Sequence, residues 1–296
     1  MGGGVPLASR LSEGRAPMVD VQIGRGKRAR QAYELDDLVI VPSRRLRDRD
    51  DVDLAWKIDA YRFRLPVVTP VESGTASAAV AAAGALPVLD LEGLVQTSAP
   101  DVGALRDAIA AARGEGRIAV RVSPTRAAEL VPVGVRAEAE LIVIQGDVVS
   151  AEHVSSEGDS DLRTLIRSTD VPVVVGGCVS YHTALHLMRT GAAGVIVGGG
   201  RPDLGIDVPL ATAIAEVRAA RVRHLDETSV YCHLVAMGDI STGVDAAKAI
   251  AVGADAVMTD VDTVTGGELA DSLRSSMAAC GYTTVKEFQR AEVAVR

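Results

Sequence analysis

From residue 66 onward the chain repeats one pattern, in which a short β-branched apolar run is followed by a longer stretch rich in Ala and Leu. The pattern occurs eight times. Continuous apolar runs are typical of parallel strands that are buried on both faces. The expected strands are 66–71, 86–90, 117–122, 141–145, 171–176, 194–198, 232–237 and 255–259.

The stretches between these runs have the composition of helices. The expected helices are 76–83, 101–113, 125–137, 161–168, 181–190, 209–223, 243–252 and 267–280. Eight strands, each followed by a helix, is the count of a (β/α)8 TIM barrel, which is an α/β fold. A doubly wound open sheet has the same alternation, because periodicity does not report on closure. We favour the barrel on the count of its units.

The chain is expected to hold one domain. Residues 1–23 are predicted to form a disordered N-terminal tail, and 24–296 a single barrel domain. The first residues are rich in Gly, Pro and Ser and lack the apolar segment of a signal peptide. Met1 and Met18 both stay open as the true start. The charged segment 44–53 is interpreted as part of a solvated lead-in to the barrel.

Composition excludes several classes of function. The net charge of −8, from 39 acidic and 31 basic residues, opposes sequence-independent nucleic-acid binding, which depends on neutralising phosphates. No apolar run approaches the roughly 18 residues of a membrane helix. Three widely spaced cysteines provide no disulfide framework and no zinc ligand set. We therefore expect a cytoplasmic protein with no metal site and no nucleic-acid or membrane partner.

In a barrel, binding residues gather at the C-terminal ends of the strands. Glycines dominate the ends of the fifth to seventh expected strands, where they let a ligand approach the backbone. Gly238, followed by a helix that begins near Gly243, fits a phosphate site at a helix N-terminus. An ordinary turn capped by Ser241 or Thr242 explains the same residues equally well.

Other motifs carry less. The glycines at 198–200 do not complete G-x-G-x-x-G, since Asp203 occupies the last position. His182 and His186 have metal-compatible spacing but no evident third ligand, so a surface or packed pair is favoured. Cys178 ends the fifth expected strand and is a weak candidate nucleophile. No base lies near it in the sequence, and inert packing is the favoured interpretation.

Five segments, in this order, are familiar as a set. They are YELDDLVIVPSRR (33–45), LPVVTPVESGT (65–75), HLMRTGAAGVIVGGG (186–200), GDISTGVDAAKAIAVGADAVM (238–258) and LRSSMAACGYTTVKEF (273–288). Together they resemble the IMP dehydrogenase/GMP reductase family over most of residues 33–288. The likeness is greatest to the short IMP-dehydrogenase-related paralogues that lack the CBS pair.

The resemblance implies a (β/α)8 barrel, usually tetrameric, that binds a purine nucleoside monophosphate. In the family a cysteine attacks the purine C2 while NAD(P) exchanges hydride; IMP becomes XMP, or GMP becomes IMP and ammonia. Cofactor contacts would fall on Gln145 and Gly146. Nucleotide and phosphate contacts would fall on Thr69, Gly176, Gly177, Gly198, Gly199, Gly200, Gly238, Asp239 and Thr259.

The departures from the family fall on its catalytic parts. The segment GGGRPDLGIDVP (198–209) replaces the family's cysteine loop and contains no Cys, Ser or Thr. Met237 stands where the family has its ribose-binding Asp, and Asp260 stands in the phosphate cradle, where a carboxylate would repel a phosphate. Only residues 260–266 join the last strand to the last helix, so the family's catalytic flap is absent.

Three functions follow as hypotheses. The first is a family barrel that binds a purine nucleotide without the C2 redox reaction, with no catalytic residue identified. The second is an active NAD(P)-dependent oxidoreductase with a rearranged site, for which Cys178 is the only replacement nucleophile we can name. The third is a non-catalytic scaffold or regulator that forms a mixed oligomer with a true paralogue. A homo-oligomer is expected otherwise.

Overall fold

The computed structural model describes residues 20–43, 45–72, 74–95, 101–114, 116–155 and 158–296. The chain divides into two compact units, Met1–Ala32 and Tyr33–Arg296. Within the first unit, β1 (Asp20–Gln22) pairs antiparallel with β2 (Arg28–Arg30). The expected tail of residues 1–23 lies mostly outside the described residues, and residues 20–22 of it form β1.

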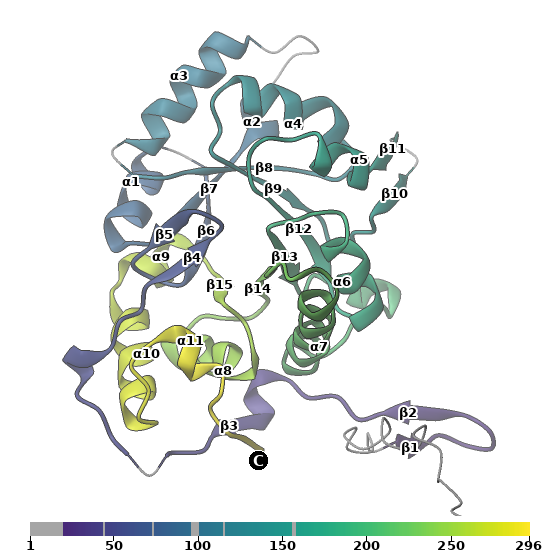
Figure 1. The fold of residues 1–296 in the computed structure, drawn as a ribbon, viewed down its shortest axis with the longest axis vertical. Helices are drawn as coiled ribbons and strands as arrows, with labels where there is room; N and C mark the ends of the chain where they lie inside the picture. Colours follow the sequence, from purple (N-terminus) through teal and green to yellow (C-terminus); the bar gives the residue numbers. More distant parts are fainter. Residues whose placement is uncertain (1–19, 44, 73, 96–100, 115, 156–157) are drawn as a thin grey trace, which may run out of the picture. The chain divides into compact units, whose positions relative to one another are not determined.

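In the second unit eight parallel strands close into a barrel (Figure 1). They follow the order of the sequence, and the last strand pairs with the first. The closure confirms the (β/α)8 fold and excludes the open sheet. Every expected strand is present, with ends within two residues of those predicted. The strands are β6 (Val67–Val71), β7 (Leu86–Asp90), β8 (Ala119–Val122), β9 (Leu141–Gln145), β12 (Val173–Cys178), β13 (Gly194–Val197), β14 (His233–Met237) and β15 (Ala256–Met258).

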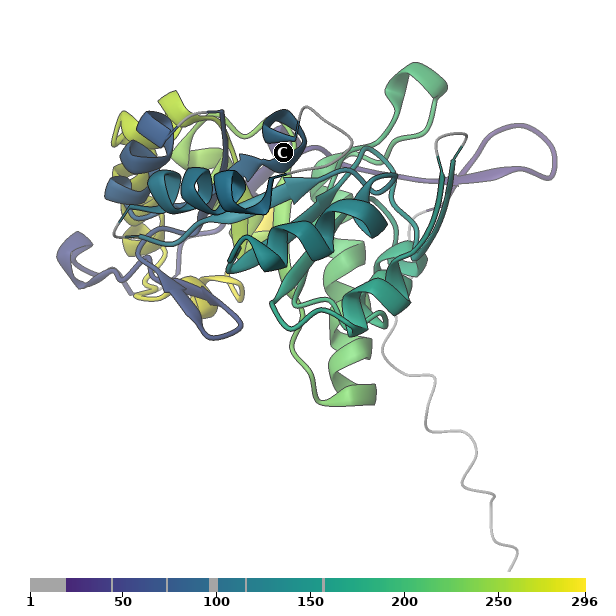
Figure 2. The same cartoon turned by 90° about the horizontal axis from the view of Figure 1, so that it is seen from above.

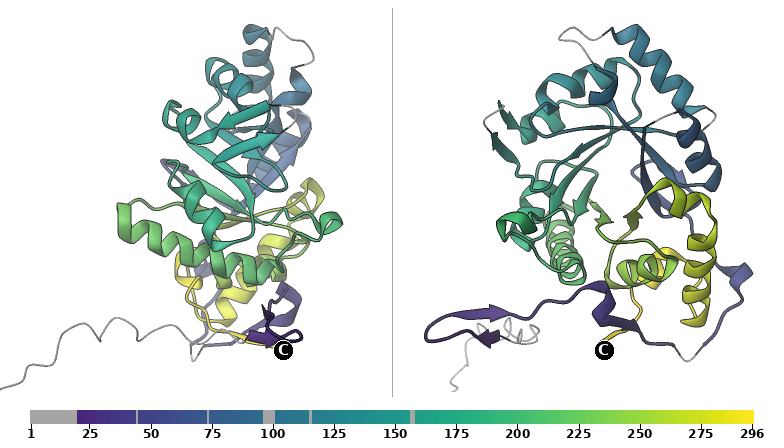
Figure 3. Two further views of the ribbon diagram at one scale, coloured as in Figure 1. Left: turned by 90° about the vertical axis from the view of Figure 1, so that its right-hand side faces the viewer. Right: turned by 180° about the vertical axis from the view of Figure 1, so that it is seen from behind.

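Helices surround these strands, as the views in Figure 3 show. All eight expected helices form. The largest difference between a predicted and an observed helix end is in α7, the long green helix of Figure 2, which continues five residues beyond the predicted end. The eight helices are α1 (Gly74–Ala83), α3 (Val102–Arg113), α4 (Ala127–Arg136), α5 (Leu162–Arg167), α6 (Tyr181–Met188), α7 (Leu210–Thr228), α8 (Gly243–Val252) and α10 (Glu268–Ala279).

Periods of 3.6 or 2 residues leave little signal in segments of three to five residues. For this reason several short elements were not expected from the sequence. They are β3 (Leu38–Ile40) with its partner β16 (Val293–Val295), the β4–β5 hairpin (Trp56–Ile58 and Tyr61–Phe63), the β10–β11 hairpin (Glu152–Ser155 and Gly158–Asp161), α2 (Leu91–Leu94), α9 (Val261–Thr265), α11 (Val285–Phe288), and the 3-10 turns Leu35–Asp37, Arg49–Asp51 and Pro202–Leu204.

Side chains alternate along the barrel strands between two apolar cores. One core lies between the strands and the helices, and the other fills the barrel interior. The β4–β5 hairpin closes the N-terminal end of the interior with Trp56, Ile58 and Phe63, whose two aromatic rings lie 5.4 Å apart. The hairpin thus plugs one end of the barrel, and the strands' C-terminal ends form the other.

Two of the features expected to be absent are a membrane-spanning helix and a metal site. In the part of the chain that the structure describes, no helix is long and apolar enough to cross a membrane. The same residues contain no group of three or more His, Cys, Asp or Glu side chains that could hold a metal ion. His182 and His186 are both exposed on the surface of α6.

Candidate functional site

The C-terminal end of the barrel carries a cavity of about 680 Å3, which we call the mouth pocket. Met237 and Met258, which also contact the interior core, give it an apolar floor. Its polar side chains are three carboxylates, one amide and one hydroxyl, and no Lys or Arg is among its described lining. The lining residues are Pro70, Glu72, Ala76, Gln145, Met237, Met258, Thr259, Asp260, Val261 and Asp262.

Gln145 is the polar group of the mouth pocket with unused bonding capacity. Its Nε2 donates a hydrogen bond to the Met237 sulfur at 3.0 Å. Its Oε1 is buried and has no hydrogen-bond partner among the described residues. A buried acceptor without a partner is costly, so this oxygen suits a ligand that donates an N–H or O–H.

Asp260 is held as an anion at the rim of the same pocket. The backbone N–H of Thr263 donates to Asp260 Oδ1 at 2.8 Å, and the Thr263 hydroxyl donates to Oδ2 at 2.9 Å. These two hydrogen bonds lower the pKa of the Asp260 carboxyl, the backbone bond most strongly. The side chain caps α9, and its negative charge faces any ligand that enters.

A second cavity of about 450 Å3, which we call the loop pocket, lies beside the ends of β13 and β14. Five carboxylates line it, and its lining within the described residues includes no Lys or Arg. Sequence reasoning missed most of these acids because they come from three separate segments of the chain. The lining residues are Glu34, Leu35, Asp36, Gly198, Gly199, Gly200, Asp207, Val208, Leu210, Met237, Gly238, Asp239, Ser241 and Asp245.

Carboxylates occupy the helix N-termini at which a phosphate was expected. Glu34 accepts a hydrogen bond from the backbone N–H of Leu210, at the start of α7, at 2.9 Å. At α8, Thr242 and Asp245 form a reciprocal capping box. Helix N-termini favour a negative charge, and here the protein's own side chains supply it. Thr242 therefore caps α8, as one of the two interpretations of this segment expects, and a phosphate site at Gly238 stays a prediction.

The predicted glycines have close neighbours of their own. A Cβ on Gly176 would collide with the backbone oxygen of Ile196, and one on Gly177 with that of Gly198. A Cβ on Gly198 would likewise collide with the Met237 oxygen. Contact between adjacent strands and loops accounts for these three glycines without a ligand.

A Cβ on Gly199 or Gly200 would also be crowded, by Met237 and by Asp207 respectively. These two glycines line the loop pocket together with Gly198, Gly238 and Asp239. Their role in binding a nucleotide stays a prediction.

The two threonines differ from the expectation. Thr69 is fully buried on β6 and shares its orientation with Val67 and Val71, which belong to the outer core. Its side chain therefore faces the helices and not the mouth pocket. Thr259 lines the mouth pocket, but its hydroxyl donates to the Ile240 backbone oxygen at 2.6 Å. Neither hydroxyl is presented to a phosphate.

Cys178 is unsuited to act as a nucleophile. Its side chain is 3% exposed within the outer core, and the thiol donates to the Ile196 backbone oxygen at 3.4 Å. Burial raises the pKa of the thiol to about 12. A reactive cysteine needs an accessible thiolate. Cys232 and Cys280 are buried as well.

The residues near the fourth barrel strand do not fit the pyrophosphate of a dinucleotide such as NAD(P). The backbone N–H of Gly146 donates to the Gly176 oxygen at 2.9 Å, and the Gly146 oxygen accepts from Gly177 N at 2.7 Å. Both backbone groups are therefore used within the barrel. Arg201 is ion-paired with Asp203 at 2.7 Å and lies 3.9 Å from Asp147, so its charge is already neutralised. We derive no hydride-transfer step through these residues.

Comparison with known proteins identifies the family of the chain. The sequence model described as the IMP dehydrogenase / GMP reductase domain matches residues 32–266. The chain is 44% identical to an uncharacterized oxidoreductase of Mycolicibacterium smegmatis, over 84% of this chain and 79% of that protein. It is 45% identical to an uncharacterized oxidoreductase of Mycobacterium tuberculosis, over 80% of this chain and 76% of the relative.

A solved structure agrees with these sequence matches. The crystal structure of an IMP dehydrogenase/GMP reductase-like protein from Corynebacterium glutamicum superimposes with a TM-score of 0.83 at 35% sequence identity. The superposition covers 94% of this chain and 98% of the other. The resemblance seen in the sequence is thereby confirmed, and the chain belongs to the IMP dehydrogenase/GMP reductase family.

Proposed function

We propose that this chain is a pseudoenzyme of its family, which binds a purine compound without the cysteine-dependent reaction at C2. The observation that carries the proposal is the lining of the C-terminal face. Glu72, Asp260 and Asp262 line the mouth pocket, further carboxylates line the loop pocket, and neither pocket has a Lys or Arg among the residues that the structure describes. Covalent attack needs a nucleophile that can be deprotonated, and the described cysteines are all buried.

The same lining favours an uncharged purine, such as a nucleoside, over a nucleoside monophosphate. A phosphate dianion next to these carboxylates would be repelled. Purine N–H groups and ribose hydroxyls are donors, and the Gln145 Oε1 and the carboxylates are acceptors. Met237 and Met258 offer the sulfur contacts that aromatic rings favour. This proposal narrows the expected partner from a nucleotide to a nucleoside.

The test compares the thermal stability of the pure protein with inosine, guanosine, IMP, GMP, XMP and NAD(P)H. A ligand at 100 times its dissociation constant adds about 2.7 kcal/mol to the free energy of unfolding. We expect the nucleosides to raise the melting temperature more than their monophosphates do. We expect no change in NAD(P)H absorbance with IMP and NAD+ or with GMP and NADPH. Tighter binding of IMP than of inosine, or turnover, refutes the proposal.

Variants separate binding in the mouth pocket from binding elsewhere. Gln145→Leu keeps a side chain of similar size but removes the unpartnered acceptor, so the inosine shift should fall. Gln31→Leu makes the same chemical change at an exposed position in the other unit and should leave the shift unchanged. An inosine response that survives Gln145→Leu in full would place the ligand outside this pocket.

The oligomeric state and the cellular location are further proposals. A homo-oligomer is expected from the family resemblance, and a mixed oligomer with a catalytic paralogue from the non-catalytic hypothesis. A cytoplasmic location is expected from the three widely spaced cysteines. Sedimentation of the pure protein tests the first. Co-purification with a tagged paralogue tests the second, and an untagged barrel that never co-purifies would count against it.

A further inference from the structure

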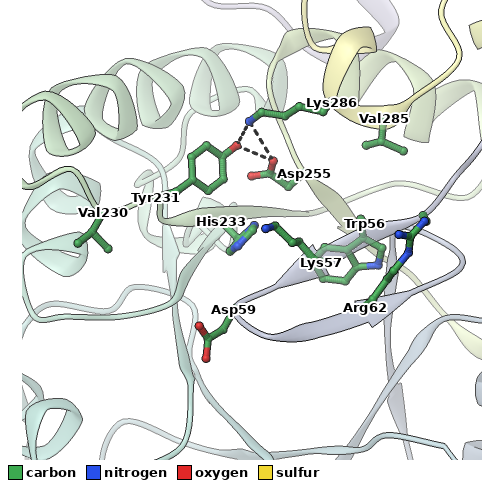
Figure 4. Close-up of a pocket in the computed structure, with 11 residues that line it drawn as sticks. Trp56, Lys57, Asp59, Arg62, Val230, Tyr231, His233, Asp255, Val285 and Lys286 are labelled. Carbon is green, nitrogen blue, oxygen red and sulfur yellow. Dashed lines mark hydrogen bonds and ion pairs between the residues drawn. The ribbon is translucent and has the colours of Figure 1, made fainter.

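A third cavity, of about 660 Å3, lies at the opposite end of the barrel, and we call it the base pocket (Figure 4). Trp56, Lys57 and Arg62 reach it from the hairpin that plugs the barrel, and His233 begins β14. Lys286 reaches it from α11. Its volume lies within the range of small-molecule sites, and no step proposed for the C-terminal face uses it.

Two buried polar groups in the lining lack partners. Trp56 is 6% exposed and His233 is 8% exposed. The Trp56 Nε1 and the His233 Nδ1 make no hydrogen bond to any described residue. Buried polar groups are nearly always satisfied by protein, water or ligand. An indole N–H can only donate, so Trp56 requires an acceptor.

The base pocket also gathers positive charge. Lys57 is exposed and makes no hydrogen bond or ion pair within the described part of the chain. Lys286 Nζ lies 3.2 Å from Gln289 Oε1, contacts the Tyr231 hydroxyl, and lies 4.0 Å from Asp255. Its side chain is 64% exposed, so the ammonium is accessible at the rim.

The acidic neighbours are mostly neutralised already. Asp255 is paired with Arg221 at 2.8 Å, and both side chains are buried. Arg62 is paired with Asp53 at 3.0 Å. Asp59, at the turn of the hairpin, is the exposed carboxylate of the lining. Against one such acid stand the ammonium groups of Lys57 and Lys286.

His233 does not add to this charge. Burial, as the largest cause, lowers the pKa of its imidazole. The charge of Asp255 opposes this effect, and the charges of Lys286, Arg221 and Lys57 add to it. The ring is therefore neutral near pH 7. It stands edge to face with the Tyr231 ring, with the centroids 5.0 Å apart.

We propose that the base pocket binds a small organic anion built on a flat ring. The anionic group would lie between Lys57 and Lys286, and the ring would lie against Trp56 and the Tyr231–His233 pair. The protein has a net charge of −8, and carboxylates line both the mouth pocket and the loop pocket, so neither of those two cavities suits an anion. The inference is independent of the proposed function, because it concerns the other end of the barrel.

Trp56 is the only tryptophan of the chain, so tryptophan emission reports on this pocket alone. Phenyl phosphate, benzoate and the neutral benzamide serve as probes in titrations of that emission. We expect a saturable change with at least one anion, weaker at high salt because ions screen the lysines. Benzamide should bind about tenfold more weakly. Comparing phenyl phosphate with benzoate shows whether the natural anion is a phosphate or a carboxylate.

Matched lysine variants test whether the lysines of the base pocket bind the anion. Lys57→Met should weaken the anion response about tenfold, and it should fold because Lys57 has no partner to lose. Lys27→Met removes the same charge from the separate hairpin of the first unit and should change nothing. Lys286→Met is a second, independent variant. An unchanged emission with both anions, an equal response to benzamide, or an unaltered anion response in Lys57→Met overturns the proposal.

Discussion

The buried ion pair between Arg221 and Asp255 should be the most sensitive polar interaction in the barrel. Asp255 Oδ2 accepts hydrogen bonds from Arg221 Nη1 at 2.8 Å and from the backbone N–H of Leu234 at 2.9 Å. Its Oδ1 accepts from the Tyr231 hydroxyl at 2.7 Å and from Gln289 Nε2 at 2.8 Å. Asp255→Asn tests this network with almost no change in volume.

The expected loss follows from this geometry. An asparagine has one oxygen, so whichever way its amide turns, its NH2 group faces a donor. The Arg221 guanidinium, 6% exposed, would also lose its counter-ion. Breaking a buried pair by removing one partner costs about 3–5 kcal/mol. For a chain of this size that corresponds to a fall of about 10 °C in melting temperature.

Urea unfolding measures the effect, provided that the slope with denaturant is unchanged. Asp271→Asn is the control, because Asp271 is also ion-paired, 3.2 Å from Arg49, but is 68% exposed. Exposed pairs contribute about 0–1 kcal/mol. Adding Arg221→Met to Asp255→Asn should restore part of the loss, since the uncompensated charge is then gone. Equal losses in Asp255→Asn and Asp271→Asn would refute this reasoning.

Three further predictions concern other parts of the barrel. Because Cys178, Cys232 and Cys280 are buried, a thiol reagent should modify none of them in the native protein and all three in urea; one fast-reacting native thiol contradicts the burial. Gly177→Ala should lower the free energy of unfolding by more than about 3 kcal/mol, because the new Cβ would collide with the Gly198 oxygen. Gly93→Ala is the control: the nearest contact of its new Cβ is at 3.8 Å, so it should be neutral or stabilising by about 0.5 kcal/mol. Burial lowers the pKa of His233 in the folded state, so the unfolded chain binds the extra proton and the free energy of unfolding should fall as pH drops below about 6.5. His233→Gln should flatten that pH dependence in urea titrations, and an identical slope would show that other groups cause it.

Much of the fold was predictable from local pattern. Parallel strands such as β9 and β12 are buried on both faces, so each reads as an unbroken apolar run. Helices begin at capping residues such as Asp101 and Thr242, which satisfy the free backbone N–H groups of the first turn. These signals are contained within a few neighbouring residues. The β4–β5 hairpin has strands of three residues, too short for a period to be recognised, and was missed.

The candidate site was only partly predictable for the same reason. The strand ends were expected to gather at one face, and they do, since chain direction alone places them together in a barrel. The direction in which each side chain points could not be predicted from local pattern, because successive residues of a strand face opposite sides of the sheet. Cys178 and Thr69 were therefore named as candidates, although both face the helices.

The sequence by itself determined the eight-fold alternation, the family, and the absence of Cys from residues 198–209, because contiguous residues carry each of these features. Only the tertiary structure decided what surrounds the cavities. Glu34 caps a helix that starts 176 residues later, and Lys286 meets Tyr231 across 55 residues. The charge of a pocket is a sum over side chains from distant segments, and barrel closure alone brings those segments together.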